Sequence, residues 1–365
     1  MNGAGTELVD ELALVPCPVV AACGGCPLMP SVRQRELEAK RASVNRALAR
    51  AELLHPALEW ACVLDRFGYR NRLRLRVTAD GHVAFFNPHK IAECAVLEPS
   101  LASLMDQIRE YSRRHPDVMR AFAHLEARAP DLDGRGGVCL QPLAGSSPTE
   151  SARALQDGVG DTITVTVAGT VSPERVPSQR WAVSDDVYAR VPLDAFLQVN
   201  TLVNRALVAH LRELARERGV QSFVDLYAGS GNLGLPLLRD GKTGVCVEAQ
   251  PSALHALGRA CLEQDLPGPL LRAESAEHAA RALFEAGERF DLAILDAPRA
   301  GVKSGIEQMA ALTRRSLAVC SCNPESLARD LRSLTALGFV LERLLLFDMF
   351  PNTRHVEVLA WLERR

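Results

Sequence analysis

The chain has 365 residues, of which 47% are hydrophobic and 24% are charged, enough for two to three domains with apolar cores. Its formal net charge of −2 excludes a polycation that coats nucleic acid, although it allows a local basic face. No apolar run approaches the roughly 18 residues that cross a bilayer, and residues 1–11 lack the basic region of a signal peptide. We therefore expect a soluble cytoplasmic protein with no membrane partner.

Cysteines cluster near the N-terminus. Cys17, Cys23 and Cys26 lie within ten residues of a Pro- and Gly-containing segment, in a chain with ten cysteines. In a reducing compartment such a cluster indicates a metal or iron–sulfur site rather than disulfides. The spacing and ligand type fit an iron–sulfur cluster and zinc equally well.

A helix is expected next, over Ser31–Glu52, with Ser31 as its N-cap. Residues 56–192 then change to short alternating segments broken by Gly, Pro and Asp, which is typical of a mostly antiparallel β domain. One helical insert is predicted at Pro99–Ala129. The predicted strands are Tyr69–Thr78, His82–Phe86, Gly137–Pro142, Asp161–Val171 and Trp181–Arg190.

Four arginines alternate through the first of these strands. Because side chains two residues apart share a face of a strand, all four should project together. Such a row suggests phosphate contacts, and Phe67 and Tyr69 beside it could stack on an unpaired base. A solvated charged face is the alternative interpretation. The row consists of Arg70, Arg72, Arg74 and Arg76.

From Leu193 onwards, helices alternate with apolar strands, which predicts a parallel, doubly wound sheet with ligands at the carboxyl ends of its strands. The fold class is therefore α/β, with domains at 1–55, 56–192 and 193–365. The predicted helices are 200–218, one from 233, 251–265, 276–287, 303–314 and 325–337. The predicted strands are Ser222–Tyr227, Gly244–Glu248, Leu270–Ala273, Leu292–Asp296, Ser316–Ser321, 339–347 and 355–362.

A Gly-rich turn follows the first strand of this region. The segment Asp225–Gly234 (DLYAGSGNLG) formally matches the dinucleotide fingerprint, and Glu248 at the end of the next strand suits ribose hydroxyls. Both features fit a dehydrogenase or a methyltransferase. The loops Asp296–Arg299 (DAPR) and Ser321–Pro324 (SCNP), which follow later strands, favour the methyltransferase.

Cys322 is the candidate nucleophile. It ends an apolar strand and directly precedes a helix, where the pKa of a thiol should be lowered. Cys320, two residues earlier, is interpreted as a buried packing residue, and the same role is the alternative for Cys322. Glu357, in the last apolar strand, is the matching candidate base. A glutamate that faces water is its alternative.

Several motifs occur in one order along the chain and together resemble the RNA uracil-5-methyltransferase family, which acts on transfer or ribosomal RNA. They are YRNRLRL (Tyr69–Leu75), FLQVN (Phe196–Asn200), DLYAGSGNLGLPL, LDAPRAG, SCNPESLARDL and DMFPNTRHVE. The resemblance implies that Cys322 adds to carbon 6 of a uridine and that Glu357 removes the carbon 5 proton after methylation. It places the cofactor, S-adenosylmethionine, at Gln198, Tyr227, Asn232, Glu248, Ser275 and Asp296.

The resemblance also bears on the cysteines and the substrate. It assigns the cluster to a structural [4Fe-4S] group that fixes an RNA-binding surface, with Cys94 as the fourth ligand beside Cys17, Cys23 and Cys26. A cluster that begins at Cys17 leaves out the N-terminal RNA-binding barrel of some members, which favours bacterial 23S ribosomal RNA over transfer RNA. One departure is Ala297, where the family has a proline. No obligate protein partner is expected.

Two further functions remain open. A methyltransferase of the same fold could act on an exocyclic amine, and it would not need Cys322. A noncatalytic iron–sulfur protein could bind RNA through the arginine row, and Ala297 is the only feature that favours it.

Overall fold

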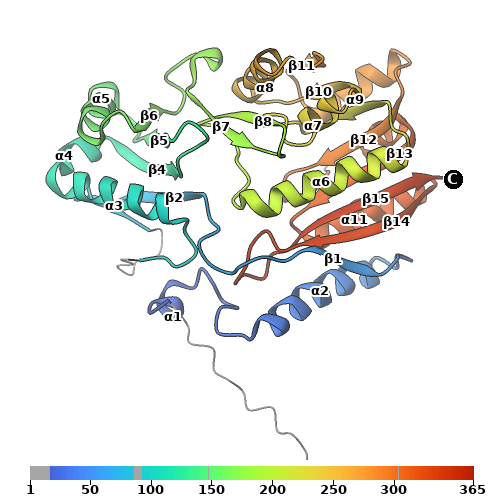
Figure 1. The fold of residues 1–365 in the computed structure, drawn as a ribbon, viewed down its shortest axis with the longest axis horizontal. Coiled ribbons are helices and arrows are strands. Elements are labelled where there is room, and N and C mark those ends of the chain that lie inside the picture. Colours follow the sequence, from blue (N-terminus) through green and yellow to red (C-terminus); the bar gives the residue numbers. More distant parts are fainter. Residues whose placement is uncertain (1–16, 86–92, 147, 303) are drawn as a thin grey trace, which may run out of the picture.

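An eight-stranded sheet forms the centre of the C-terminal half of the protein (Figure 1). The computed structural model describes residues 17–85, 93–146, 148–302 and 304–365. In spatial order the strands are β1 (Leu58–Cys62), β14 (Phe339–Phe347), β15 (Glu357–Arg364), β13 (Thr313–Ser321), β12 (Phe290–Asp296), β9 (Ser222–Asp225), β10 (Thr243–Val247) and β11 (Leu270–Arg272). Neighbours from β13 to β11 pair in parallel, whereas β15 is antiparallel to both β13 and β14.

Helices cover both faces of this sheet because its strands are apolar on both sides. In β12, Leu292 and Ile294 enter one core cluster, and Ala293 and Leu295 enter the other. The first cluster also holds buried residues of α6 (Thr201–Glu217), α7 (Gly234–Arg239) and α8 (Pro251–Glu263). The second holds those of α2 (Arg33–Arg50), α9 (Ala276–Glu285), α10 (Ile306–Ala311) and α11 (Pro324–Ala336). The predicted doubly wound α/β architecture is confirmed.

A five-stranded sheet occupies the middle of the chain. Its pairs are antiparallel except β5 and β6, which run parallel and are joined through helix α5 (Pro148–Val159). Helices α3 (Pro99–Arg114) and α4 (Pro116–Met119) contact α5 beside it. In spatial order the strands are β3 (Val83–Ala84), β2 (Arg72–Val77), β4 (Phe122–Arg128), β5 (Gly136–Pro142) and β6 (Ile163–Val167).

Three smaller elements complete the fold. A hairpin of β7 (Ser178–Ala182) and β8 (Tyr188–Pro192) contacts α8, and so does the short 3₁₀ helix Pro173–Arg175. The cysteine-bearing N-terminal segment contains the one-turn helix α1 (Val20–Cys23). Among the described residues, no helix has the length and apolar character needed to cross a membrane.

Several element predictions were wrong in the middle of the chain. The end of the predicted helical insert forms β4, because Leu125 and Ala127 are buried on one face of an extended segment. The predicted strand Trp181–Arg190 is the turn and parts of both strands of the β7–β8 hairpin. Ser31 is not the N-cap of α2, since Val32 holds that position without a side-chain hydrogen bond. Phe86, at the end of a predicted strand, lies outside the described residues.

Candidate active site

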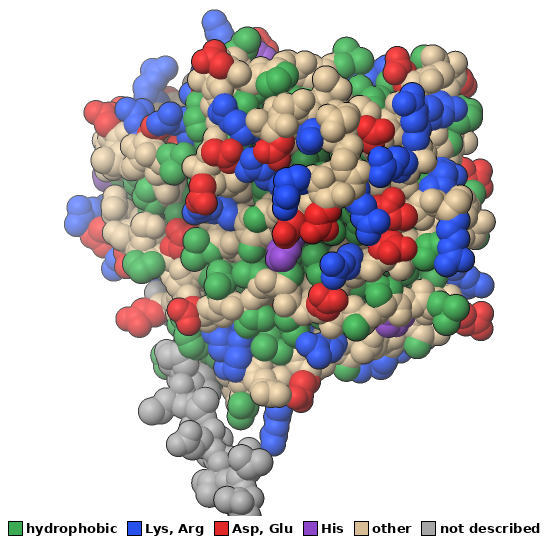
Figure 2. Space-filling view, turned by 45° about the vertical axis from the view of Figure 1, so that its right-hand side comes forward, with side chains coloured by type: hydrophobic (Ala, Val, Ile, Leu, Met, Phe, Trp, Pro, Cys, Tyr) green, Lys and Arg blue, Asp and Glu red, His purple; other side chains and the backbone are tan. Residues whose placement is uncertain are grey.

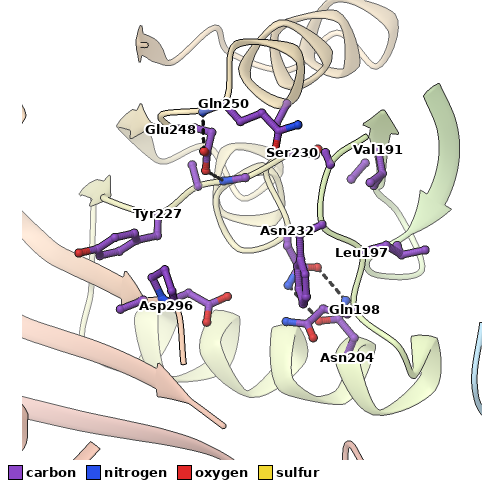
Figure 3. Close-up of a pocket in the computed structure, with 18 of the residues that line it drawn as sticks. Val191, Leu197, Gln198, Asn204, Tyr227, Ser230, Asn232, Glu248, Gln250 and Asp296 are labelled. Carbon is purple, nitrogen blue, oxygen red and sulfur yellow. Dashed lines mark hydrogen bonds between the residues drawn. The ribbon is translucent and has the colours of Figure 1, made fainter. Parts of the chain in front are cut away.

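A cavity of about 600 Å³ opens where β9, β10, β12 and β13 end and where β15 begins (Figure 3). Parallel strands present their following loops at this edge, and antiparallel β15 presents its first residue there. All of the predicted catalytic and cofactor-binding residues line the cavity: Cys322, Glu357, Gln198, Tyr227, Asn232, Glu248, Ser275 and Asp296.

The Gly-rich turn after β9 is shaped around Glu248. Gly229 and Gly231 have φ angles of +53° and +90°, which favour glycine, and a side chain at Gly231 would come within 2.6 Å of Leu235. The amide of Gly229 donates to Glu248 Oε2 at 2.9 Å, and the amide of Gln250 donates to Oε1 at 2.7 Å (Figure 3). The Glu248 carboxylate is therefore fixed at the cavity wall.

A pair of amides closes the cavity on the α6 side. Asn204 Nδ2 donates to Asn232 Oδ1 at 2.7 Å, and Asn232 Nδ2 donates to Asn204 Oδ1 at 2.9 Å (Figure 3). Beside them, the backbone carbonyl of Gln198 accepts a hydrogen bond of 2.8 Å from the buried amide of Asn71. Asn71 and Asn204 were missed in the sequence because they act through hydrogen bonds between distant segments.

The lining suits S-adenosylmethionine, which has a cationic sulfonium, ribose hydroxyls and a flat adenine. Carboxylates are available at Glu248 and Asp296, and apolar walls at Val191 and Leu197. Within the described part of the chain, the hydroxyl of Ser230 is buried without a hydrogen-bond partner, so the cavity still has a polar group to offer a ligand. Ser275 instead uses its hydroxyl to cap α9, accepting from the amide of His278 at 3.2 Å.

Two carboxyl groups and a thiol line the cavity where β12 and β13 end and β15 begins: Asp296, Glu357 and Cys322. Glu357 is 5% exposed, and burial and the neighbouring Asp296 raise its pKa well above the usual value. Burial also raises the pKa of Asp296. The Cys322 thiol has its pKa raised to about 11 by burial and by Glu357, although Arg299 opposes the shift. The expected lowering at the start of α11 is wrong, since desolvation and negative neighbours outweigh the helix terminus.

Aromatic and cationic side chains also line the same cavity, although none was predicted from the sequence to do so. Phe196 lines it while remaining 64% exposed, and the guanidinium of Arg72 lies 4.7 Å from the centre of its ring. Phe350 and Arg299 line the cavity near Cys322. An exposed phenylalanine at the mouth of a cavity is suited to stacking on a base.

The predicted cluster cysteines lie in two segments, 17–26 and 94. Burial, together with interactions with Cys94, Cys23 and Cys17, raises the pKa of Cys26 to about 12, so the four thiols are neighbours. Across residues 17–85, 93–146, 148–302 and 304–365, no three His, Cys, Asp or Glu side chains are positioned as a metal site. The two segments therefore bring the four thiols near one another, but not into the positions of metal ligands.

The arginine row is only partly as expected. The strand begins at Arg72, so Arg70 lies outside it; its Nε donates to the carbonyl of Arg72, and its charge lowers the pKa of Cys26. The other three are engaged within the protein, with Glu126 (Arg72), His124 (Arg74) and the Phe85 carbonyl (Arg76).

The aromatic residues beside the row differ in their surroundings. Phe67 is exposed, whereas Tyr69 is half-buried and its hydroxyl donates to the Pro351 carbonyl at 3.1 Å. Basic and acidic side chains are mixed over the face shown in Figure 2, without a broad patch of either sign.

Comparison with known proteins decides the family. The chain is 30% identical over 379 residues to the 23S rRNA (uracil(1939)-C(5))-methyltransferase RlmD of Pseudomonas fluorescens, covering 95% of this chain and 78% of that protein. RlmD of Pseudomonas putida is 28% identical, with 98% and 81% covered. The chain belongs to the RNA uracil-5-methyltransferase family.

Two further findings agree with this membership. The family model described as tRNA (Uracil-5-)-methyltransferase matches residues 284–365, the part of this RNA uracil-5-methyltransferase that holds Asp296, Cys322 and Glu357. The crystal structure of Pyrococcus abyssi tRNA (uracil-54, C5)-methyltransferase with S-adenosyl-L-homocysteine has the same fold, with a TM-score of 0.72. It is 23% identical, covering 93% of this chain and 84% of that one. The protein is thus a methyltransferase.

Proposed function

We propose that this RNA uracil-5-methyltransferase transfers a methyl group from S-adenosylmethionine to carbon 5 of a uridine in 23S ribosomal RNA. The observation that carries the proposal is the convergence of Cys322, Glu357 and Asp296 in one cavity with the Gly-rich turn and Glu248. The similarity to RlmD proteins along nearly the whole chain supports ribosomal RNA as the substrate. Transfer RNA is the alternative, favoured by the tRNA (Uracil-5-)-methyltransferase family model over residues 284–365 and by the likeness of fold to the Pyrococcus abyssi enzyme.

Six residues hold the cofactor in this proposal. Glu248, fixed by two backbone amides, binds the ribose hydroxyls, and Asn232 and Gln198 bind polar groups on the α6 side. Tyr227, Ser275 and Asp296 complete the site. When bound, the cofactor supplies an electrophilic methyl group on a cationic sulfur.

Cys322 and Glu357 do the remaining chemistry. The Cys322 thiolate adds to carbon 6 of the uracil, which makes carbon 5 nucleophilic. After carbon 5 is methylated, the Glu357 carboxylate removes its proton, the double bond re-forms, and Cys322 leaves as a thiolate. Glu357 is buried and Cys322 is partly buried, which limits the access of water to the adduct.

The raised pKa values fit this order of events. Without ligands, burial and the neighbouring Asp296 raise the pKa of both the Cys322 thiol and the Glu357 carboxyl, because ionising either would add a charge to a desolvated site that already contains Asp296. A positive charge in the same cavity favours their ionised forms. The residues are therefore suited to become reactive when a cationic cofactor is present.

The RNA would approach along the central sheet. Phe196 is placed to stack on the flipped uracil at the mouth of the cavity, with Arg72 over its other face. The predicted phosphate contacts of Arg70, Arg72, Arg74 and Arg76, and base contacts of Phe67 and Tyr69, remain part of the proposal. Because the side chains of Arg70, Arg74, Arg76 and Tyr69 form hydrogen bonds within the protein, RNA would have to compete with these partners.

A [4Fe-4S] cluster on Cys17, Cys23, Cys26 and Cys94 is also proposed. The neighbouring thiols supply the ligands that an iron–sulfur cluster requires, and Arg70 supplies a compensating positive charge. Anaerobic purification followed by metal and acid-labile sulfide analysis should find iron and sulfide together. Zinc without sulfide would contradict this part of the proposal.

The decisive experiment traps the covalent intermediate. Purified protein is incubated with S-adenosylmethionine and 23S ribosomal RNA or transfer RNA that contains 5-fluorouridine, and the products are separated on a denaturing gel. Fluorine at carbon 5 cannot leave as a proton, so a protein–RNA adduct should accumulate. Mapping the attached nucleotide identifies the substrate.

Two variants make the result specific. Cys322→Ala should abolish the adduct, whereas Cys320→Ala should retain it, because Cys320 is buried in β13 and does not line the cavity. Methylation that persists in Cys322→Ala would instead indicate an exocyclic amine as the target. Failure of the wild-type protein to bind cofactor or modify either RNA would favour a noncatalytic role.

A further inference from the structure

Lys40 is a fully buried lysine within a cluster of charged side chains. The Lys40 side chain on α2 is 0% exposed, and its ammonium donates to Glu36, at 2.8 Å, to Asp348, and to the Phe350 carbonyl, at 3.0 Å. All three ammonium hydrogens therefore have acceptors. Arg33 and Arg66 add further ion pairs to the same two carboxylates.

These acceptors are linked to one loop, Asp348–Asn352, between β14 and β15. Asp348 and Phe350 are part of the loop, and Glu36 binds it. Glu36 Oε1 accepts from the amide of Asn352 at 2.6 Å, and Asn352 Nδ2 donates to the Arg66 carbonyl at 2.7 Å. Asn352 has a φ of +67°, a conformation that asparagine tolerates better than most residues. The loop is thus fixed at both ends and at Phe350 by groups outside the C-terminal sheet.

The same network reaches the cysteine-bearing segment. The amide of Leu28, two residues after Cys26, donates to the Asn352 carbonyl at 3.0 Å. The guanidinium of Arg66 donates to the carbonyls of Leu28 and Met29 at 3.0 and 3.1 Å. In Figure 1 the red loop between β14 and β15 accordingly points towards the blue N-terminal segment.

Buried charges of this kind are costly, and replacing them with apolar residues is often neutral or stabilising in other proteins. The main effect of these buried charges is to fix the position of the loop, rather than to stabilise the fold. This loop carries Phe350 into the cavity that contains Cys322, and five residues after Asn352 the chain reaches Glu357. A shift of the loop would therefore move an aromatic wall and the candidate base together.

We propose that Lys40 is a positioning residue for the methyl transfer: with Glu36 and Asp348 it sets the Asp348–Asn352 loop, and hence Phe350 and Glu357, against Cys322. The inference rests on the proposed function of that cavity. It assigns to α2, which touches neither cofactor nor reacting base, a part in the chemical step. Glu248 is held by the amides of Gly229 and Gln250 and not by this network, so we expect the network to affect the chemical step more than cofactor binding.

The test compares Lys40→Met with Arg50→Met. Methionine keeps most of the length of the buried side chain but donates no hydrogen bond, and Asp348 and Glu36 retain Arg33 and Arg66 as partners. Arg50 lies on the same helix in an exposed pair with Glu325, which contributes little. We expect kcat to fall at least about tenfold in Lys40→Met with KM for S-adenosylmethionine within about twofold, and Arg50→Met to match the wild type.

A second measurement reports on the loop without any ligand. Hydrogen exchange of peptides covering 348–355 should be faster in Lys40→Met than in the wild type, with residues 228–236 unchanged. Glu36→Gln, which still offers an acceptor to Asn352, should restore most of the turnover that Glu36→Ala loses. Unchanged exchange, or a kcat within twofold of the wild type, would overturn the positioning role. A wild type that methylates no RNA would sink the proposed function instead.

Discussion

Cys322 shows how neighbours decide reactivity at the scale of one residue. Its position before α11 suggested a lowered pKa, yet burial, Glu357 and Asp296 raise it, and Arg299 only partly compensates. A helix terminus contributes a fraction of a charge, whereas removing water from a thiolate acts on its full charge. The thiol of the free protein is therefore protonated near neutral pH.

Alkylation of Cys322 tests this account. In the free protein, the rate with iodoacetamide should be slow at pH 7 and rise about tenfold per pH unit towards pH 11, because only the thiolate reacts. In Glu357→Gln the rate at pH 9 should be several-fold higher, since a charge that opposes the thiolate is gone. Fragment-ion mass spectrometry of the peptide 316–329 separates the reaction of Cys322 from that of Cys320, which lies in the same peptide.

Arg299→Gln serves as the opposite control. Its guanidinium lowers the Cys322 pKa, so its loss should slow alkylation at the same pH. A Cys322 that reacts at pH 7 as fast as a free thiol would contradict the raised pKa.

Some residues of the site can be recognised from local sequence motifs, and others cannot. Cys322, Glu357 and the cofactor residues follow strand ends in recognisable motifs, and all line the cavity. Phe196, Asn71 and Lys40 act through contacts between segments far apart in sequence, which no local pattern records. The surroundings of the arginine row are hidden for a related reason: alternation predicts a shared face, but not that Glu126 and His124 on β4 contact Arg72 and Arg74.

At the scale of elements, the Gly-rich turn is braced by α6. The reciprocal amides of Asn204 and Asn232 join the helix to the turn, and Asn204 is 5% exposed. A buried amide that loses its partner costs about 1–3 kcal/mol. The orientation of Asn232 therefore depends on a helix that precedes the turn by a full strand.

Asn204→Leu should weaken S-adenosylmethionine binding. Leucine has the same branched shape but leaves the Asn232 amide unpaired, so we expect the dissociation constant to rise roughly tenfold, which corresponds to about 1.4 kcal/mol. Isothermal titration calorimetry measures it directly. Leu202→Ala, an exposed position on the same helix, is the control, and equal affinities in both variants would show that the amide pair is dispensable.

Elements of the C-terminal half were predicted well because each buried strand and amphipathic helix repeats one strong pattern. In the middle of the chain the patterns conflict. Residues 122–128 continue a helical stretch in composition, but pairing with β2 and β5 makes them a strand. Residues 183–187 form a tight turn, with Val183 donating to the Val187 carbonyl, inside what alternation reads as one strand.

At the scale of the whole molecule, the expected borders between domains are crossed by the core. Strand β1, from the segment 56–192, is the edge strand of the eight-stranded sheet, and α2 packs its apolar face into the second core cluster. The first cluster runs without interruption from Leu75 in the central sheet to Trp361 in β15. A continuous core predicts that the two sheets unfold together.

Leu140→Ala tests this cooperativity. Leu140 is fully buried in β5 of the central sheet, so its loss should destabilise the protein by about 2–5 kcal/mol. In a background where Trp60 and Trp181 are phenylalanine, fluorescence of Trp361 reports only the eight-stranded sheet. If the sheets form one unit, the urea midpoint at Trp361 should fall with that of the circular dichroism signal, because both belong to one transition. Leu54→Ala, 95% exposed, should leave it unchanged.

A Trp361 midpoint that stays at the wild-type value while the circular dichroism shows an earlier step would mean that the central sheet unfolds by itself. Its coupling to the catalytic cavity would then depend on local contacts such as Arg128, whose guanidinium donates to the Pro192 carbonyl at 2.9 Å, rather than on a shared core.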